Sequence, residues 1–168
     1  MNVTGHLAVG SSFYLMAATL VPEHPLLQSP PLWFAGLSLT LIGALLPDID
    51  HPNSTFGQKV KFISYPLSMI FGHRGITHSL LAICMIVFFL LRFMDASYNS
   101  VIGLLLSPLM LGYLSHLFAD ALSPMGVPLL YPNKKRFTIP IIRGSISEFI
   151  VYSSMLSVSI WLYFNNYF

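Results

Sequence analysis

The heptapeptide HRGITHS, residues 73–79, places two histidines and an arginine directly before a long apolar run. LPDIDH, residues 46–51, and SHLFAD, residues 115–120, place carboxylates and imidazoles beside other apolar runs. Imidazole and carboxylate together are ligands for zinc, manganese or iron. His116 and Asp120 are four residues apart, so on a helix they would share a face and could chelate one ion. These residue types point first to metal chemistry.

A metal cluster would draw on all three motifs. Asp48 and Asp50 can offer oxygens to one metal or bridge two, and His78 would enter at a helix N-terminus. His51 and His73 are either direct ligands or residues that orient a ligand. The candidate ligands are His6, Asp48, Asp50, His51, His73, His78, His116, Asp120 and Glu148. Zinc is the first expectation, with manganese and iron as alternatives.

Each motif also has a purely structural interpretation when taken alone. A hydrogen bond can join His116 to Asp120, and HRGITHS can be the polar start of a helix with Thr77 as its cap. His24, beside Glu23, is expected to be an interfacial polar residue without a metal role. The metal hypothesis therefore depends on a fold that gathers the motifs.

The amino-acid composition predicts the class of fold. The chain has 168 residues, which predicts a single domain over residues 1–168. It is 55% hydrophobic and 8% charged, whereas soluble domains carry about 25% charged residues. These values predict an integral membrane protein; buried helices of a soluble core are the alternative, which the number of apolar runs makes improbable. A net charge of +2 without a basic stripe argues against direct nucleic-acid binding.

The hydrophobic runs predict an all-α membrane protein with about five transmembrane helices. An amphipathic helix lying in the membrane interface is expected within residues 53–72, interrupted near Pro66. Residues 127–142 predict a short extended hairpin-like loop around a Pro-Asn-Lys-Lys turn. The five predicted spans are residues 5–21, 32–46, 78–94, 100–122 and 147–164.

Basic residues predict the orientation. Seven of the eight lysines and arginines fall between spans two and three or between spans four and five, and only Arg92 lies near the opposite side. The positive-inside rule then places the N-terminus and both long loops in the cytoplasm and the C-terminus outside. In such an up-and-down bundle every polar motif reaches the cytoplasmic rim, where a metal cluster can form.

The residues expected at this rim suit the hydrolysis of a phosphoester. Asp50 or Asp48 could position or deprotonate the attacking water. Arg74 or Arg143 could hold the phosphate, because a guanidinium offers a bidentate fork. The expected substrate is a phospholipid or another phosphorylated lipid; no protein partner can be inferred.

Several linked motifs carry a family resemblance: GHL near the start, LLPDIDHPNSTFGQKVKFIS, FGHRGITHSLLA and LGYLSHLFADALSPMGVPLLYP. Together they resemble the YdjM-like family of LexA-regulated, inner-membrane-associated metal-dependent hydrolases, over about residues 4–149. The resemblance implies a bacterial cytoplasmic-membrane protein with phospholipase-like, zinc-dependent chemistry, and induction in the DNA-damage (SOS) response. Its motif residues here would be His6, Asp48, Asp50, His51, His73, His78, His116 and Asp120, with Glu148 at a late acidic position.

A different class of function remains open. The chain could bind metal without catalysis, as a sensor, a carrier or a stress-response interaction partner. A carrier is the weakest of these, because carriers place ionisable groups near the bilayer midplane, and here they gather at one rim.

Overall fold

The computed structural model describes residues 2–22, 29–54, 56–72, 74–93, 96–133 and 135–167. Among these residues there are helices and no strands, so the all-α prediction is confirmed for them. An isolated antiparallel bridge joins Val127 to Phe137 and gives the loop after α5 a hairpin-like start. The helices are α1 (Val3–Leu20), α2 (Pro30–Gly43), the 3₁₀ helix η2 (Leu46–Asp50), α3 (Lys61–Phe71), the 3₁₀ helix η3 (Ile76–His78), α4 (Leu80–Phe93), α5 (Ala96–Ala121) and α6 (Ser145–Tyr167).

Local sequence explains how α1 and α2 begin. The side chain of Asn2 accepts a hydrogen bond from the backbone N–H of Gly5 at 2.8 Å and caps α1. Pro30 and Pro31 occupy the first turn of α2, where a missing N–H costs no intrahelical bond. Pro108 lies inside α5, and the helix continues through it.

Three helical segments of the described chain are long and apolar enough to cross a membrane: Val3–Leu20, Pro30–Asp50 and Ser145–Asn166. The described part of α4 has 14 residues, about 21 Å of helix, against a hydrocarbon core about 30 Å thick. Crossing of the bilayer by α4 and α5, and hence the five-span arrangement, stays a prediction.

The predicted interfacial helix is shorter than expected. Helix α3 begins only at Lys61, and it continues through Pro66 without interruption. The preceding residues form turns because Ser54 holds them: its hydroxyl donates to the carbonyl of Asp48 at 2.9 Å and accepts from the N–H of Gly57 at 2.8 Å. A Cβ at Gly57 would lie 2.1 Å from the carbonyl oxygen of His51, so only glycine permits this close turn.

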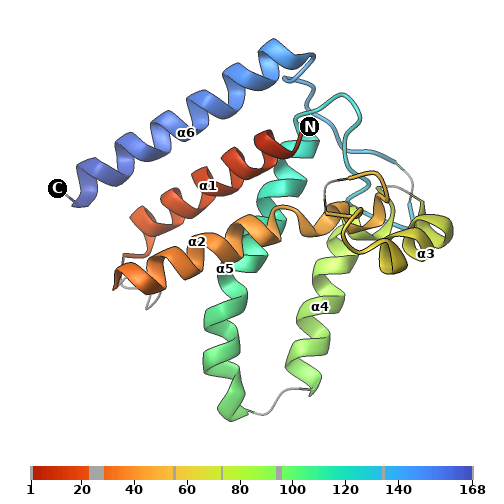
Figure 1. Cartoon of the computed structure of the whole chain (residues 1–168), viewed down its shortest axis with the longest axis horizontal. Helices are drawn as coiled ribbons and strands as arrows, with labels where there is room; N and C mark the ends of the chain where they lie inside the picture. Colours follow the sequence, from red (N-terminus) through yellow and green to blue (C-terminus); the bar gives the residue numbers. More distant parts are fainter. Residues whose placement is uncertain are drawn as a thin grey trace.

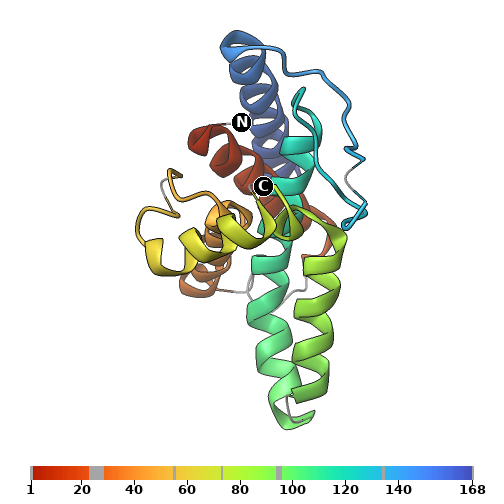
Figure 2. The ribbon, with the colours of Figure 1, turned by 90° about the vertical axis from the view of Figure 1, so that its right-hand side faces the viewer.

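The helices meet at one end of the molecule. Figure 1 shows α1 and α6 side by side and running in the same direction, with α2 running the opposite way beside α1. Helix α5 packs across α1 and α2, and Figure 2 shows that α4 and the start of α5 extend away from the other helices. The first turn of α1, the end of α2, the start of α4 and the end of α5 converge near the N-terminus, while the C-terminus lies at the far end of α6 (Figure 1).

Candidate metal centre

Six of the predicted ligands lie at this convergence, and five of them, all except Asp50, belong to two groups of closely spaced ligand atoms. They come from four separate parts of the chain: the first turn of α1, η2, η3 and the last turns of α5. The side chains of His6, His78, His116 and Asp120 are at most 1% exposed, whereas that of Asp48 is 17% exposed. The fold thus gathers the scattered motifs, and Asp48 has the most exposed side chain of the five.

Glycines bring α2 and α5 close enough to place His116. A Cβ at Gly43 would lie 2.0 Å from the carbonyl oxygen of Leu109, and one at Gly112 would lie 1.9 Å from that of Thr40. The two backbones therefore touch. The carbonyl oxygen of Ala44, just after α2, lies 2.7 Å from Nδ1 of His116. Because a carbonyl can only accept, Nδ1 carries the proton and Nε2 is left as a ligand atom facing the centre.

Four ligand atoms surround a common point: Nε2 of His78, Nε2 of His116, Oδ1 of Asp48 and Oδ2 of Asp120. The two nitrogens are 3.3 Å apart. Each nitrogen is 3.7 Å from the Asp48 oxygen and 3.7 Å from the Asp120 oxygen. Ligand atoms about 2.0–2.1 Å from a tetrahedral zinc ion are separated by about 3.3–3.4 Å. The N–N and N–O distances are close to this spacing, so these atoms can approach the shell of one metal ion, although Asp48 and Asp120 belong to different groups of closely spaced ligand atoms.

His6 extends this cluster. Its ring stacks on that of His116, with centroids 3.8 Å apart and planes inclined by 6°. Its Nε2 lies 3.5 Å from Oδ1 of Asp120, while its Nδ1 is buried and has no hydrogen-bond partner among the described residues. His6 can therefore hold the Asp120 carboxylate or act as a further ligand; together with His116 and Asp120 it makes a second group of closely spaced ligand atoms.

Asp50 lies behind His78. Its Oδ2 accepts hydrogen bonds from the backbone N–H of Arg74 at 3.1 Å and from the hydroxyl of Thr77, and it is 3.4 Å from Nδ1 of His78. Burial lowers the pKa of His78, but the carboxylates of Asp48 and Asp50 outweigh that effect, so its pKa lies above the ordinary value. A metal ion at Nε2 would compete with a proton for this nitrogen.

Comparison with known proteins places this arrangement in a family. The family model described as "YdjM inner membrane protein" matches residues 1–166. The inner membrane proteins YdjM of Escherichia coli (strain K12) and Shigella flexneri are each 38% identical over 168 residues, covering 96% of this chain and 83% of theirs. The chain belongs to the YdjM family.

A more distant relative broadens the comparison. The uncharacterized protein YvsG of Bacillus subtilis (strain 168) is 37% identical over 125 residues, covering 73% of this chain and 74% of its own. No solved structure matches the chain. The predicted YdjM resemblance is confirmed, and the names of the two relatives at 38% identity, both inner membrane proteins, support a membrane location for this family.

Arg74 of this YdjM-family chain has an internal role that the sequence did not suggest. Its Nη2 lies 2.7 Å from Oδ2 of Asp120, and its Nη1 donates to the carbonyl oxygen of Gly126 at 3.1 Å. The residue is 7% exposed and has a φ of 59°, a left-handed backbone that is uncommon outside glycine. That backbone turns the N–H towards Asp50 and the guanidinium towards Asp120. The predicted contact with substrate phosphate would compete with these bonds.

The remaining predicted ligands are placed as follows. His51 is half-buried and lies outside both groups of closely spaced ligand atoms. Glu148 also lies outside them; its Oε1 accepts a hydrogen bond from the backbone N–H of Asn2 at 2.8 Å and ties α6 to the start of α1. His73 falls outside the described residues.

Sequence reasoning missed some supporting residues. Thr77 bonds to Asp50 and has its hydroxyl 3.0 Å from Nδ1 of His78, so it supports the ligand and does not cap α4 as expected. The hydroxyl of Tyr113 donates to the carbonyl oxygen of Thr77. Tyr113 stands three residues before His116, about one helical turn away. That spacing could have indicated that the two side chains lie on the same face of the helix.

Proposed function

We propose that this chain is a metal-dependent hydrolase that cleaves a phosphoester in a lipid or lipid-linked substrate at the cytoplasmic face of the inner membrane. The main observation behind the proposal is a pair of imidazole nitrogens 3.3 Å apart in a buried junction, each of them 3.7 Å from one oxygen of Asp48 and one oxygen of Asp120. Among the described residues, this junction contains three carboxylates and one guanidinium, that of Arg74, so a divalent cation would balance the excess negative charge.

His78, His116, Asp48 and Asp120 would hold the ion; two imidazoles and two carboxylates favour zinc, with manganese and iron as alternatives. A bound ion would make water more acidic and stabilise negative charge on a phosphoryl oxygen. Asp48, whose side chain is 17% exposed, can reach both the cluster and a molecule outside it, so it is the better candidate for the general base. Asp50 would hold the His78 imidazole in position from behind.

The lipid substrate follows from the surroundings. The chain belongs to a family of inner membrane proteins, and three of its helices can cross a bilayer. A site at the end of such helices would lie at the depth of phospholipid headgroups. Arg143, an exposed residue next to α6, is the other predicted phosphate ligand. Because Arg74 is already bonded to Asp120 and Gly126, Arg143 has more donors available for a phosphate.

Induction by DNA damage is part of the same proposal, and transcript levels after such damage test it.

The multi-pass orientation is proposed from the basic residues. Helices α1 and α6 run in the same direction (Figure 1), as the first and last of five alternating spans must. Cysteine labelling in intact cells should place Lys134 in the cytoplasm and Phe168 outside. Labelling of both positions from the same side would remove a span and refute the proposed shared rim.

A metal-binding protein without hydrolytic activity is the second candidate. Its support is the burial of the cluster, because structural metal sites are closed whereas catalytic ones keep an open position. Under this reading the chain would act as a sensor or as an interaction partner in stress.

One experiment separates these candidates. The full-length protein, purified in detergent, would be analysed for bound metal and then assayed for release of phosphate or headgroup from mixed phospholipids and polyprenyl phosphates, with added zinc or manganese. We expect stoichiometric metal and turnover, with turnover abolished in Asp48→Asn and retained in the charge control Lys59→Gln. Metal without turnover on any of these substrates, or on generic phosphodiesters, would leave the non-catalytic candidate; absence of metal from folded protein would refute both.

A further inference from the structure

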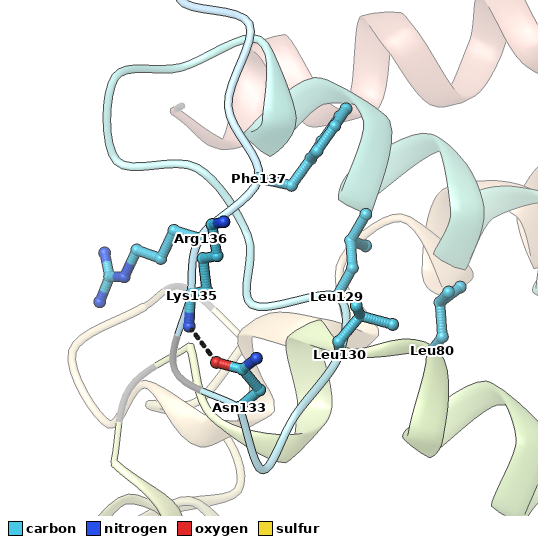
Figure 3. Close-up of a pocket in the computed structure, with 7 residues that line it drawn as sticks. All are labelled: Leu80, Leu129, Leu130, Asn133, Lys135, Arg136 and Phe137. Carbon is cyan, nitrogen blue, oxygen red and sulfur yellow. Dashed lines mark hydrogen bonds between the residues drawn. The ribbon is translucent and has the colours of Figure 1, made fainter.

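A second site lies beside the metal cluster, at the start of α4. It is a cavity of about 390 Å³ between α4 and the loop that follows α5. Figure 3 shows its walls: Leu80, Leu129, Leu130 and Phe137 supply apolar surface, and Lys135 and Arg136 supply positive charge. We call it the basic pocket. None of its lining residues is acidic.

The basic pocket is held by backbone hydrogen bonds. Val127 and Phe137 exchange two of them, at 2.9 and 2.8 Å, and so close the base of the loop. The N–H of Leu80 donates to the carbonyl oxygen of Leu129 at 3.0 Å, which fastens the loop to the first turn of α4. The N–H of Lys135 donates to the side chain of Asn133 at 3.0 Å (Figure 3). These bonds support the described walls of the pocket.

The apolar wall is exposed in the protein alone. Leu130 is 70% exposed, Phe137 51% and Leu80 42%. This apolar surface continues along α4 through the exposed side chains of Leu81, Met85 and Phe88. Burying such surface is favourable by about 25 cal/mol per Å², so a ligand with a hydrocarbon chain would gain from lying along this path.

The charged wall lies on the other side. Arg136 donates from Nη1 to the carbonyl oxygen of Met125 at 3.0 Å, and Figure 3 shows its guanidinium pointing away from the leucine side chains. One carbonyl bond leaves most of its five donors for another acceptor. The pocket thus separates an apolar side from a cationic side, as an anionic amphiphile does.

We infer that the basic pocket binds an anionic phospholipid, with the phosphate against Lys135 and Arg136 and the first part of an acyl chain against the leucines. The volume is near the lower end of the range for small-molecule sites, about 300–1,000 Å³, so it takes a headgroup region and not a whole lipid. The rest of the chains would follow α4. This inference does not rest on hydrolysis or on metal, because none of the four ligand residues lines the pocket.

The test uses the full-length protein in detergent with limiting phosphatidylglycerol or phosphatidylcholine, and native mass spectrometry counts the retained lipids. We expect wild type to retain phosphatidylglycerol preferentially, and Lys135→Gln/Arg136→Gln to lose that preference by about tenfold or more, because the change removes both cations that distinguish an anionic from a zwitterionic headgroup. The matched control is Lys59→Gln/Lys61→Gln, which removes the same charge from exposed residues elsewhere; it should behave like wild type.

A second variant guards against a misfolded loop. Leu130→Asp changes an exposed side chain that makes no part of the bridge, and it should weaken phosphatidylglycerol binding while leaving the helical circular dichroism unchanged. Equal loss in the Lys59/Lys61 control, equal retention of both lipids by wild type, or full competition by millimolar inorganic phosphate would overturn the inference. The last outcome would indicate a free-anion site. His116→Ala should leave lipid preference intact, so failure here is distinguishable from failure of the metal proposal.

Discussion

The metal cluster and the basic pocket are neighbours with opposite designs. His78 belongs to the cluster and Leu80, two residues later, lines the pocket. The cluster is acidic and mostly buried, and polar contacts hold His78, His116 and Asp120 in place, whereas the pocket is basic, open and largely apolar. A small, strongly charged ion requires converging ligands withdrawn from water, while a flexible amphiphile requires area and a charge at one end. One helix start therefore serves two kinds of recognition, and mutations should affect the two regions independently.

Loss of a ligand from the cluster should produce the largest effect. His116→Ala or Asp120→Ala removes a fully buried metal ligand from the cluster and should abolish stoichiometric metal binding. Elemental analysis of folded, detergent-purified protein measures this. Lys135→Gln/Arg136→Gln and His24→Ala should keep their metal. Equal metal content in all these variants would mean that the cluster is not a metal site.

Gly112→Ala tests whether the close crossing of α2 and α5 determines the geometry of the metal cluster. The added Cβ would meet the Thr40 carbonyl oxygen at 1.9 Å, so α2 and α5 must separate. Overpacking of this kind costs about 1–3 kcal/mol or more, and it would also move Ala44 away from His116. We expect a lower melting temperature and weaker metal binding, but unchanged lipid preference.

Gly144→Ala is the matched control for that change, because a Cβ there would meet nothing within 4 Å. Its melting temperature should equal that of wild type. A Gly112→Ala protein as stable as this control would contradict the close crossing of α2 and α5.

Arg74→Lys should have an intermediate effect. Lysine keeps the charge but cannot contact Asp120 and Gly126 with two separate nitrogens, and charge-assisted hydrogen bonds contribute about 1.5–3 kcal/mol each. We expect reduced stability and reduced metal affinity, measured by thermal unfolding with and without zinc. If substrate use alone falls while metal affinity and stability stay unchanged, Arg74 acts on the phosphate, as the sequence first suggested.

The smallest effects are expected at two predicted ligands outside the close groups. His51→Ala should leave metal content unchanged. Glu148→Gln should also keep the metal and lose only part of its hydrogen bond to the N–H of Asn2, with a change in stability of about 0.5–1.5 kcal/mol or less. Loss of metal in either variant would enlarge the cluster beyond its five gathered residues.

Much of the fold was predictable because apolar periodicity and proline positions mark helices strongly. Each of the five long runs coincides with a helix, although membrane crossing is supported for only three helical segments. The predicted interfacial helix was too long because local hydrogen bonds of the Ser54 hydroxyl, to Asp48 and from Gly57, accompany turns where a helix was expected. Apolar spacing alone contains no sign of them.

The sequence indicated which residues gather at the candidate site better than it indicated what each of them contacts. The predicted alternation of helix directions placed His6, Asp48, His78, His116 and Asp120 at one end of the bundle, and the structure gathers their side chains there. The alternation could not show that Asp50 lies behind His78, or that Arg74 turns inward, because both depend on a left-handed backbone at Arg74. That conformation, rare for arginine, has no signature in the residue types.

The packing of α6 has a consequence for how the protein is made. Helix α6 packs mainly on α1 and supplies none of the four converging ligand atoms. Because synthesis proceeds from the N-terminus, every one of those ligands has been translated before α6 leaves the ribosome. The polar junction can therefore assemble while the chain is still being inserted, with α6 arriving as a late cover over α1.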